Sequence, residues 1–340
     1  MPGLAPSHTS ELALVADIGG TNARFAMIAP GGSDIVSPII LRCADYPGVA
    51  DAARAYLAQT KPRHKPRLAA IDIAGPVIGG VGELTNHPWR IDANDVRRDL
   101  ALERVELVND FAALAHAVPR LAAGDRATIR AGAKGAAGPI GVVGPGTGLG
   151  VAAVIPDGAG GWVPLASEGG HVTVAAVDER EDAILGALRR RFGHVSAERV
   201  LSGPGLVNLY EAVCTLAHEP AQALTPEQVA EHAQAGDPHP AEALSLFFAW
   251  LGNVTGNLAL TVGAVGGIAI AGGIVPRYLP LLAASKFEQR FLDKGRLRAY
   301  LEPIPVYCVT HPLPAFIGLA ALLAEPESEH RASRLADAPT

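Results

Sequence analysis

Short apolar runs alternate with amphipathic stretches along this chain. An apolar run that ends at glycine or a polar residue predicts a buried strand, whereas apolar residues at helical spacing predict a helix. The expected strands are 12–18, 22–29, 36–43, 68–74, 105–108, 140–143, 150–155, 268–271 and 306–309. The expected helices are 48–59, 93–100, 110–118, 178–192, 204–217, 239–262 and 314–324, and the Ala- and Gly-rich stretch 128–138 is expected to be a surface connection. This alternation predicts an α/β fold.

The composition places the chain among globular proteins and limits the classes of partner that it is expected to bind. Its 340 residues are 49% hydrophobic and 18% charged, and the length favours two lobes. The formal net charge of −6, without a long basic run, argues against a nucleic-acid partner. Cys43, Cys214 and Cys308 are far apart and form no CxxC pair, so we expect reduced thiols in a cytoplasmic protein.

Neither a leader nor a membrane span is expected. The N-terminal residues lack the basic start and apolar core of a signal peptide. Residues 258–275 form an uncharged run of 18 positions, long enough for a span. Several glycines interrupt this run and Pro276 follows it, so two short buried elements are expected instead.

A glycine turn between the first two predicted strands is the sharpest local signal, in Asp17-Ile18-Gly19-Gly20-Thr21-Asn22. Glycines let the backbone approach a phosphate and point N–H groups at it, Thr21 adds a hydroxyl, and Asp17 could hold Mg²⁺ directly or through water. A Rossmann loop would lead into a helix and a Walker loop needs Gly-Lys, neither of which occurs here. A strand, glycine turn and strand with a leading Asp is typical of actin, hexokinase and Hsp70 folds, although a plain hairpin remains the alternative.

Two further glycine turns follow predicted strands. Gly144–Gly150 again lies between two strands, with Gly146, Thr147 and Gly148 at its centre, and resembles the first turn in context. This weak internal repeat indicates two related lobes that each offer a glycine hairpin. Gly272-Gly273 comes after strand 268–271, where it is expected to lie against adenosine or to be a plain strand-to-helix turn.

Several polar residues are candidates for the chemistry between these turns. Asp110 follows strand 105–108, where a carboxylate base for phosphoryl transfer is expected, with Asn109 beside it to hold a hydroxyl. On spacing alone, Asp110 as a helix cap is the stronger reading. Glu168, His171 and Glu198 could bind sugar hydroxyls. Taken singly, His171 reads as a structural histidine and Glu198 as a first-turn helix acid.

Together these motifs resemble the bacterial glucokinase family of proteobacterial and cyanobacterial type. The matching strings are LVADIGGTNARFA at 14–26, LTNHPW at 84–89, ELVNDFAALAHAV at 106–118, GPGTGLG at 144–150, SEGGH at 167–171, SAERVLSGPGLVNLY at 196–210 and AGGIVPR at 271–277. They keep the family's order over nearly the whole chain. The related ROK group carries a cysteine-rich zinc motif that this chain lacks, so no structural zinc is expected.

The resemblance implies a two-lobed, actin-like ATPase fold of hexokinase type, with the active-site cleft between the lobes. It implies a small lobe of 12–120 plus 311–325, a large lobe of 121–310, and flexible ends at 1–11 and 326–340. It also implies lobe closure on the sugar and a homodimer.

The activity implied by the resemblance is ATP-dependent phosphorylation of glucose, with Asp110 as the base. The implied sugar ligands are Asn109, Asp110, Glu168, His171 and Glu198. The implied contacts of ATP and Mg²⁺ are Asp17, Gly19, Gly20, Thr21, Asn22, Gly146, Thr147, Gly148, Gly272 and Gly273, with Asp17 as the metal ligand.

Three alternatives remain open at this point. The first is a kinase for another hexose, and the second is a non-catalytic sugar-binding regulator with the same fold. Such regulators usually carry a DNA-binding module, whereas only about eleven residues precede the first predicted strand here. The third is an actin-like or chaperone ATPase, which would not need the polar cluster of sugar ligands.

Overall fold

The computed structural model describes residues 12–84, 87–133 and 137–325. The ends that were expected to be flexible, 1–11 and 326–340, lie outside these residues. The chain forms two compact units. The first holds residues up to Leu121 together with those from Pro312, and the second spans Ala122–His311.

The first unit is built on a five-stranded sheet in the order β3-β2-β1-β4-β8. Its strands are β1 (Ala13–Ile18), β2 (Asn22–Ile28), β3 (Val36–Arg42), β4 (Leu68–Ile73) and β8 (Arg104–Asn109). The first three strands pair antiparallel, whereas β4 and β8 run parallel to β1. A small antiparallel sheet of β5 (Val77–Ile78), β6 (Val81–Glu83) and β7 (Arg90–Asp92) adjoins it, which the sequence analysis missed.

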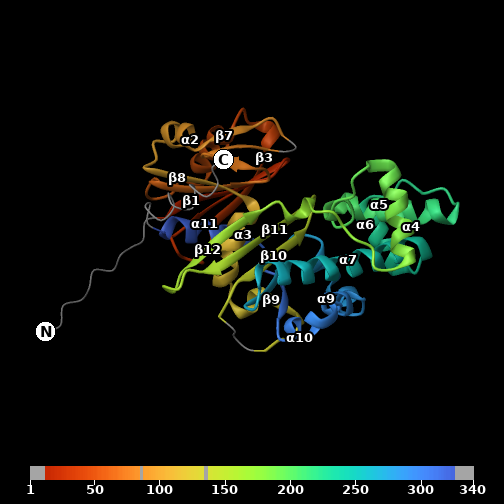
Figure 1. The fold of residues 1–340 in the computed structure, drawn as a ribbon. Helices are drawn as coiled ribbons and strands as arrows, with labels where there is room; N and C mark the ends of the chain where they lie inside the picture. The colour runs from red at the N-terminus through yellow and green to blue at the C-terminus, as the bar shows by residue number, and fades with distance from the viewer. Residues whose placement is uncertain (1–11, 85–86, 134–136, 326–340) are drawn as a thin grey trace. The chain divides into compact units, whose positions relative to one another are not determined.

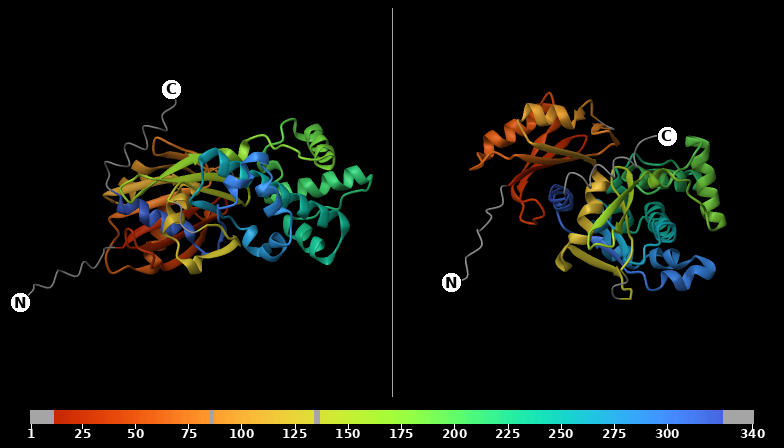
Figure 2. Two further views of the ribbon diagram at one scale, coloured as in Figure 1. Left: turned by 60° about the horizontal axis from the view of Figure 1, so that its bottom comes forward. Right: turned by 60° about the vertical axis from the view of Figure 1, so that its left-hand side comes forward.

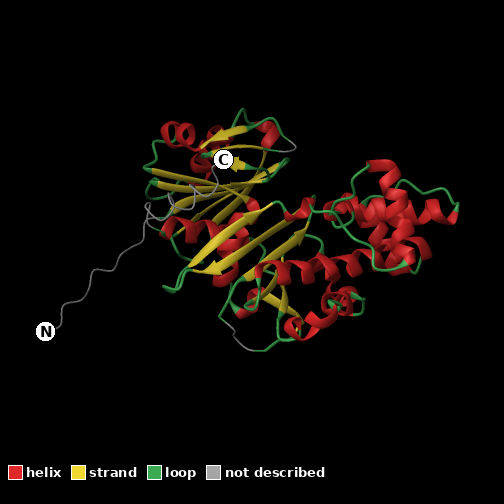
Figure 3. Ribbon diagram, viewed as in Figure 1, coloured by secondary structure: helices red, strands yellow, loops and turns green. Residues whose placement is uncertain are grey.

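Helices cover both faces of this sheet (Figures 1 and 3). They are α1 (Val49–Thr60), α2 (Ala93–Asp99), α3 (Asp110–Ala117) and α11 (Pro314–Ala324). Leu14, Ala16 and Ile18 of β1 pack with α1 and α2, whereas Ala13 and Val15 pack with α3 and α11. Figure 2 shows α11, from the end of the chain, against the strands at its beginning.

The second unit is built on a six-stranded sheet in the order β12-β11-β10-β13-β14-β9. Its strands are β9 (Arg126–Arg130), β10 (Ile140–Pro145), β11 (Leu149–Pro156), β12 (Trp162–Ser167), β13 (Gly267–Ile270) and β14 (Val306–Val309). Its helices are α4 (Glu179–Phe192), α5 (Gly203–Ala217), α6 (Pro226–Ala235), α7 (Pro238–Val262), α8 (Leu279–Ala283), α9 (Phe287–Leu292) and α10 (Arg298–Leu301). One continuous apolar core joins the helices to the sheet.

The two sheets share one topology. In each, an antiparallel hairpin with a glycine turn is followed by a third antiparallel strand, and two parallel strands then extend the opposite side. The order β12-β11-β10-β13-β14 therefore repeats β3-β2-β1-β4-β8, with β9 added at one edge. The weak repeat in the sequence corresponds to this repeat of topology.

The expectation of a surface connection at 128–138 is wrong at its start. Residues 126–130 form β9, which pairs antiparallel with β14 at the edge of the sheet. The strand is polar because it carries two arginines whose guanidinium groups stack on aromatic rings. Arg126 lies over the ring of Tyr307, and Arg130 lies over the ring of Phe291. An edge strand of this kind has no apolar alternation for sequence analysis to detect.

Helix α7 is long and apolar enough to cross a membrane by length and composition alone. Most of its apolar window, 72%, is buried inside the structure, as in the core helix of a globular unit. The uncharged run 258–275 is not one helix, because α7 ends at Val262 and β13 begins at Gly267. Two elements are therefore present as expected, but the first is the end of the 25-residue helix α7, where Thr261 is exposed, rather than a short buried element.

Candidate active site

Asp17 lies near the end of β1, on the face of the sheet that α3 and α11 cover. Every second side chain of a strand points to the same face, and Ala13 and Val15 pack against those helices, so Asp17 is on their face as well. The antiparallel register places Asp17 opposite Arg24, whose Nη1 donates to Asp17 Oδ2 at 2.9 Å. The Asp17 side chain keeps 25% of its exposure. Asp17 is thus fixed in place yet accessible, as a ligand to a cation or its water must be.

A further carboxyl group, Asp72, was missed by the sequence analysis. The parallel register of β1 and β4 places Asp72 beside Asp17, and its side chain is fully buried. Among the described residues, neither Asp72 oxygen accepts a hydrogen bond. Burial, and then the charges of Asp17 and Asp110, raise the pKa of Asp72 well above 3.8. The available signal was a single Asp inside the apolar run 68–74.

Asp110 is the first residue of α3, directly after β8. Asn109 caps the helix, and Asn109 Oδ1 and Asp110 Oδ1 each accept the Phe111 N–H at 2.9 Å. The sequence left open that Asp110 caps this helix. That alternative is wrong, because Asn109 is the cap and Asp110 is the first helical residue. Burial raises the pKa of Asp110 to about 6, and the Phe111 N–H opposes this rise. Such a carboxylate is ionised at neutral pH and basic enough to accept a proton.

The side chain of Asn109 is held at both ends. Its Oδ1 caps α3, and its Nδ2 donates to the carbonyl oxygen of Gly75 at 3.0 Å. One amide hydrogen and one lone pair remain for another partner, because a carboxamide has two donors and two acceptor sites. The side chain is therefore oriented before any ligand binds.

The first glycine turn joins β1 to β2. Gly19 N–H donates to the Asn22 carbonyl at 2.9 Å, and the Thr21 carbonyl accepts the Cys43 N–H at 2.9 Å. Gly19, Gly20 and Asn22 are half-buried, whereas Thr21 at the tip is exposed. The base of the turn is thus fixed and its tip is open to an incoming ligand.

The second glycine turn joins β10 to β11 in the other unit. Gly146 N–H donates to the Gly148 carbonyl at 2.8 Å, which closes the turn. Thr147 is exposed at its tip, as Thr21 is in the first turn. Two equivalent hairpins therefore each present one threonine to the surface of their unit.

The third glycine turn lies beside the second. Gly272 and Gly273 follow β13, which is the parallel neighbour of β10, and both are exposed. Gly272 has φ +86°, and a Cβ there would overlap the carbonyl oxygen of Pro145. Only glycine fits this close approach. The second and third turns thus lie side by side at the carboxyl ends of the neighbouring strands β10 and β13.

The three candidate sugar ligands of the second unit lie in or directly before two short helices, η4 (Gly169–His171) and η5 (Ala197–Arg199), which contact each other, and η4 also contacts β11. Glu198, in η5, accepts the Leu149 N–H on Oε2 at 3.0 Å. Glu168 is the N-cap of η4 and His171 is its last residue, and the His171 N–H donates to the Glu168 carbonyl at 2.9 Å. A Cβ on Gly170 would overlap the Leu149 carbonyl oxygen, so this glycine lets η4 pack directly on β11.

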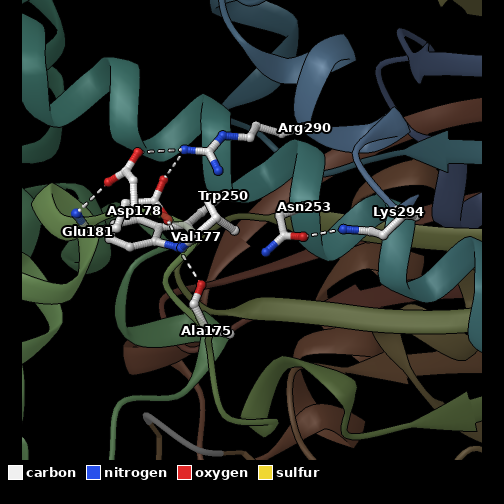
Figure 4. Close-up of polar contacts among 8 residues, drawn as sticks. All are labelled: Ala175, Val177, Asp178, Glu181, Trp250, Asn253, Arg290 and Lys294. Carbon is white, nitrogen blue, oxygen red and sulfur yellow. Dashed lines mark hydrogen bonds and ion pairs between the residues drawn. The ribbon is translucent and has the colours of Figure 1, made fainter. Parts of the chain in front are cut away.

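A polar network centred on the buried residues Arg290 and Glu181 anchors the segment that follows His171 (Figure 4). Arg290 of α9 pairs with Glu181 of α4 at 2.5 Å and with Asp178, the cap of that helix, at 3.2 Å. Glu181 Oε2 also accepts the Val177 N–H at 3.0 Å, and Trp250 Nε1 donates to the Ala175 carbonyl at 3.1 Å. The chain between η4 and α4 is therefore attached to α4, α7 and α9. Alongside it, Lys294 donates to Asn253.

The sequence and the fold match known proteins closely. The sequence model of the Glucokinase family matches residues 14–326. A glucokinase of Paramagnetospirillum magneticum is 49% identical over 320 residues, which cover 94% of this chain and 99% of that protein. The crystal structure of a glucokinase from an Antarctic psychrotroph has a TM-score of 0.84 and 38% identity, over 92% of this chain and 98% of that chain.

A more distant structure shares the fold alone. It is a ROK family glucokinase from Streptomyces griseus in complex with glucose and AMPPNP. Its TM-score is 0.63 at 22% identity, over 92% of this chain and 98% of that chain.

Proposed function

Because this chain belongs to the glucokinase family, we propose that it transfers the terminal phosphoryl group of ATP to the 6-hydroxyl group of glucose. The fold is the actin-like ATPase fold of hexokinase type. One observation carries the catalytic part of the proposal. Asp110 is a half-buried carboxylate with a pKa of about 6, placed at the end of a strand and beside the charge of Asp17.

Asp110 acts as the general base in this proposal. The 6-hydroxyl oxygen forms a bond to the γ-phosphorus as the bond from that phosphorus to its bridging oxygen breaks. The hydroxyl proton passes to the Asp110 carboxylate, and ADP departs with the bridging oxygen. A positioned base of this kind contributes roughly 10²–10⁴-fold to the rate.

The donor set of the first unit fits Mg²⁺ bound together with a nucleotide. Among the described residues, no group of three His, Cys, Asp or Glu side chains could hold a metal ion alone. Mg²⁺ usually combines one or two carboxylates with substrate phosphates and water, and Asp17 offers such an accessible carboxylate. When bound, the ion would neutralise charge that develops on the phosphates.

The remaining roles follow the predicted residues. The sugar hydroxyls are bound by Asn109, Glu168, His171 and Glu198. The carboxylate, imidazole and carboxamide groups of these residues can accept hydrogen bonds from the hydroxyl groups. The glycine turns at Gly19–Asn22 and Gly146–Gly148 receive the phosphates, and Gly272-Gly273 lies against adenosine. We further propose that the protein is a cytoplasmic homodimer that supplies glycolysis with glucose 6-phosphate.

Turnover of ATP with Mg²⁺, measured with and without glucose, tests this function. Formation of glucose 6-phosphate, followed by its coupled oxidation, should be fast and should depend on glucose. Asp110→Ala should lower turnover by roughly 10²–10⁴-fold while the protein stays folded. Near wild-type turnover in this variant would exclude Asp110 as the base.

A panel of hexoses compared by kcat/KM identifies the preferred sugar. A pocket that hydrogen-bonds each hydroxyl should discriminate by about 10⁴–10⁵ against a sugar that lacks one. A higher kcat/KM for another hexose would replace glucose in the proposal. Glucose binding without any turnover would indicate a sugar-binding regulator.

A further inference from the structure

The predicted sugar ligand Glu198 is bonded to the glycine turn that is predicted to receive phosphate. Its Oε2 accepts the N–H of Leu149, the residue directly after the Gly146–Gly148 turn, at 3.0 Å. A hydrogen bond to an ionised carboxylate is stronger than one between neutral groups. The orientation of the Glu198 side chain and the position of the turn therefore depend on each other.

The segment that carries Glu198 holds the turn at a second point. Gly203 N–H donates to the Gly146 carbonyl at 2.8 Å. Ser202 fixes the spacing between the two points, because its hydroxyl donates to the Glu198 carbonyl at 2.9 Å and accepts the Gly205 N–H at 3.0 Å. The turn is thus bonded to residues on both sides of Ser202, all within the second unit.

The absence of a side chain at position 148 makes this arrangement possible. A Cβ on Gly148 would lie 2.5 Å from Glu198 Oε2, closer than atoms of this kind approach. A Cβ on Gly146, in the same turn, would have no atom within 4 Å. A side chain at position 148 would therefore displace the carboxylate of Glu198 from its place beside the turn.

We propose that Glu198 is shared between the two substrate subsites of the second unit. One carboxylate oxygen positions the phosphate-binding turn through Leu149, and the other oxygen binds a sugar hydroxyl. Occupancy of either subsite then fixes the side chain on which the other depends, so the sugar and the nucleotide bind with positive coupling. This inference rests on the proposed function, since it takes a hexose and ATP as the ligands.

Two alanine variants of the same turn provide the test. In calorimetric titrations without nucleotide, Gly148→Ala should weaken glucose binding by roughly tenfold to a hundredfold, because its methyl group displaces the Glu198 carboxylate. Gly146→Ala is the matched control, and its glucose affinity should stay within about twofold of wild type, since its methyl group meets nothing. Equal glucose affinity in the two variants would overturn the inference.

Amide hydrogen exchange of Leu149 tests the positioning role without any ligand. Glu198→Ala should speed this exchange by about tenfold, whereas Glu198→Gln, which keeps an acceptor for the Leu149 N–H, should restore much of the protection. Unchanged exchange in Glu198→Ala would overturn the positioning role.

Failure of the proposed function gives a different pattern. If the wild-type protein neither binds nor phosphorylates any hexose, the proposed function is wrong. The proposal that Glu198 is shared between a sugar subsite and the glycine turn is then wrong as well. The exchange of Leu149 would still report separately on the link between Glu198 and the turn.

Discussion

Replacement of Asp110 by Asn should make the protein more stable and nearly inactive. The carboxyl group has a pKa raised from 3.8 to about 6, chiefly because burial disfavours its charged form. Each pKa unit corresponds to about 1.36 kcal/mol, so the ionised carboxylate costs roughly 3 kcal/mol of folding free energy at neutral pH. Asn keeps an oxygen for the Phe111 N–H but loses about 0.3–1 kcal/mol of charge interaction with the helix N-terminus. The expected net gain is about 2 kcal/mol.

The gain should depend on pH with a definite sign. The folded pKa lies above the unfolded one, so the neutral carboxyl is favoured by folding and stabilises the protein fully below about pH 3.8. This contribution is lost progressively as the pH rises to about 6. Asp110→Asn should therefore match wild type near pH 4 and exceed it near pH 7.5.

Urea unfolding of both proteins at the two pH values measures the difference, with turnover of glucose and ATP as the second readout. Asp92→Asn is the matched control, because Asp92 caps α2 in the same unit and Asn is an equally good cap. The control should change neither the stability nor its pH dependence by more than about 0.5 kcal/mol. A gain in Asp110→Asn that is absent at pH 7.5, or equal at both pH values, would refute burial as the cause.

Two further predictions concern packing, each with a matched control measured by thermal and urea unfolding. Gly318→Ala in α11 should destabilise the first unit by about 1–3 kcal/mol, because the new methyl group would overlap the Ala113 carbonyl of α3. Its control, Gly186→Ala, should stabilise α4 by roughly 0.5–1 kcal/mol, because the new Cβ would lie 3.9 Å from Arg190 Nη1, an ordinary contact distance. Arg290→Ala should cost about 3–5 kcal/mol since it leaves Glu181 buried without its partner, whereas loss of the exposed Arg180 should cost at most about 1 kcal/mol.

Most elements of the fold are determined by consecutive residues. Apolar periodicity and glycine position act within a few residues, so they predict the strands on either side of both glycine hairpins and the long helix α7. The same local signals place Asn109 and Asp110 at the junction of a strand and a helix. Strands β9 and β12 escape prediction because neither shows an alternation of buried apolar and exposed polar residues: β9 begins and ends with arginine, and β12 contains Pro164 and leaves apolar residues exposed.

The sequence by itself determined the α/β class, the repeated hairpins and the candidate residues, because each depends on the chemistry of neighbouring residues. Only the tertiary structure decided which groups meet. The register of β1 and β4 sets Asp72 beside Asp17, and burial there favours its neutral form. The packing of η5 on the second turn gives the carboxylate of Glu198 its backbone partner. Such contacts join residues distant in sequence, and their energies depend on burial, which no local pattern specifies.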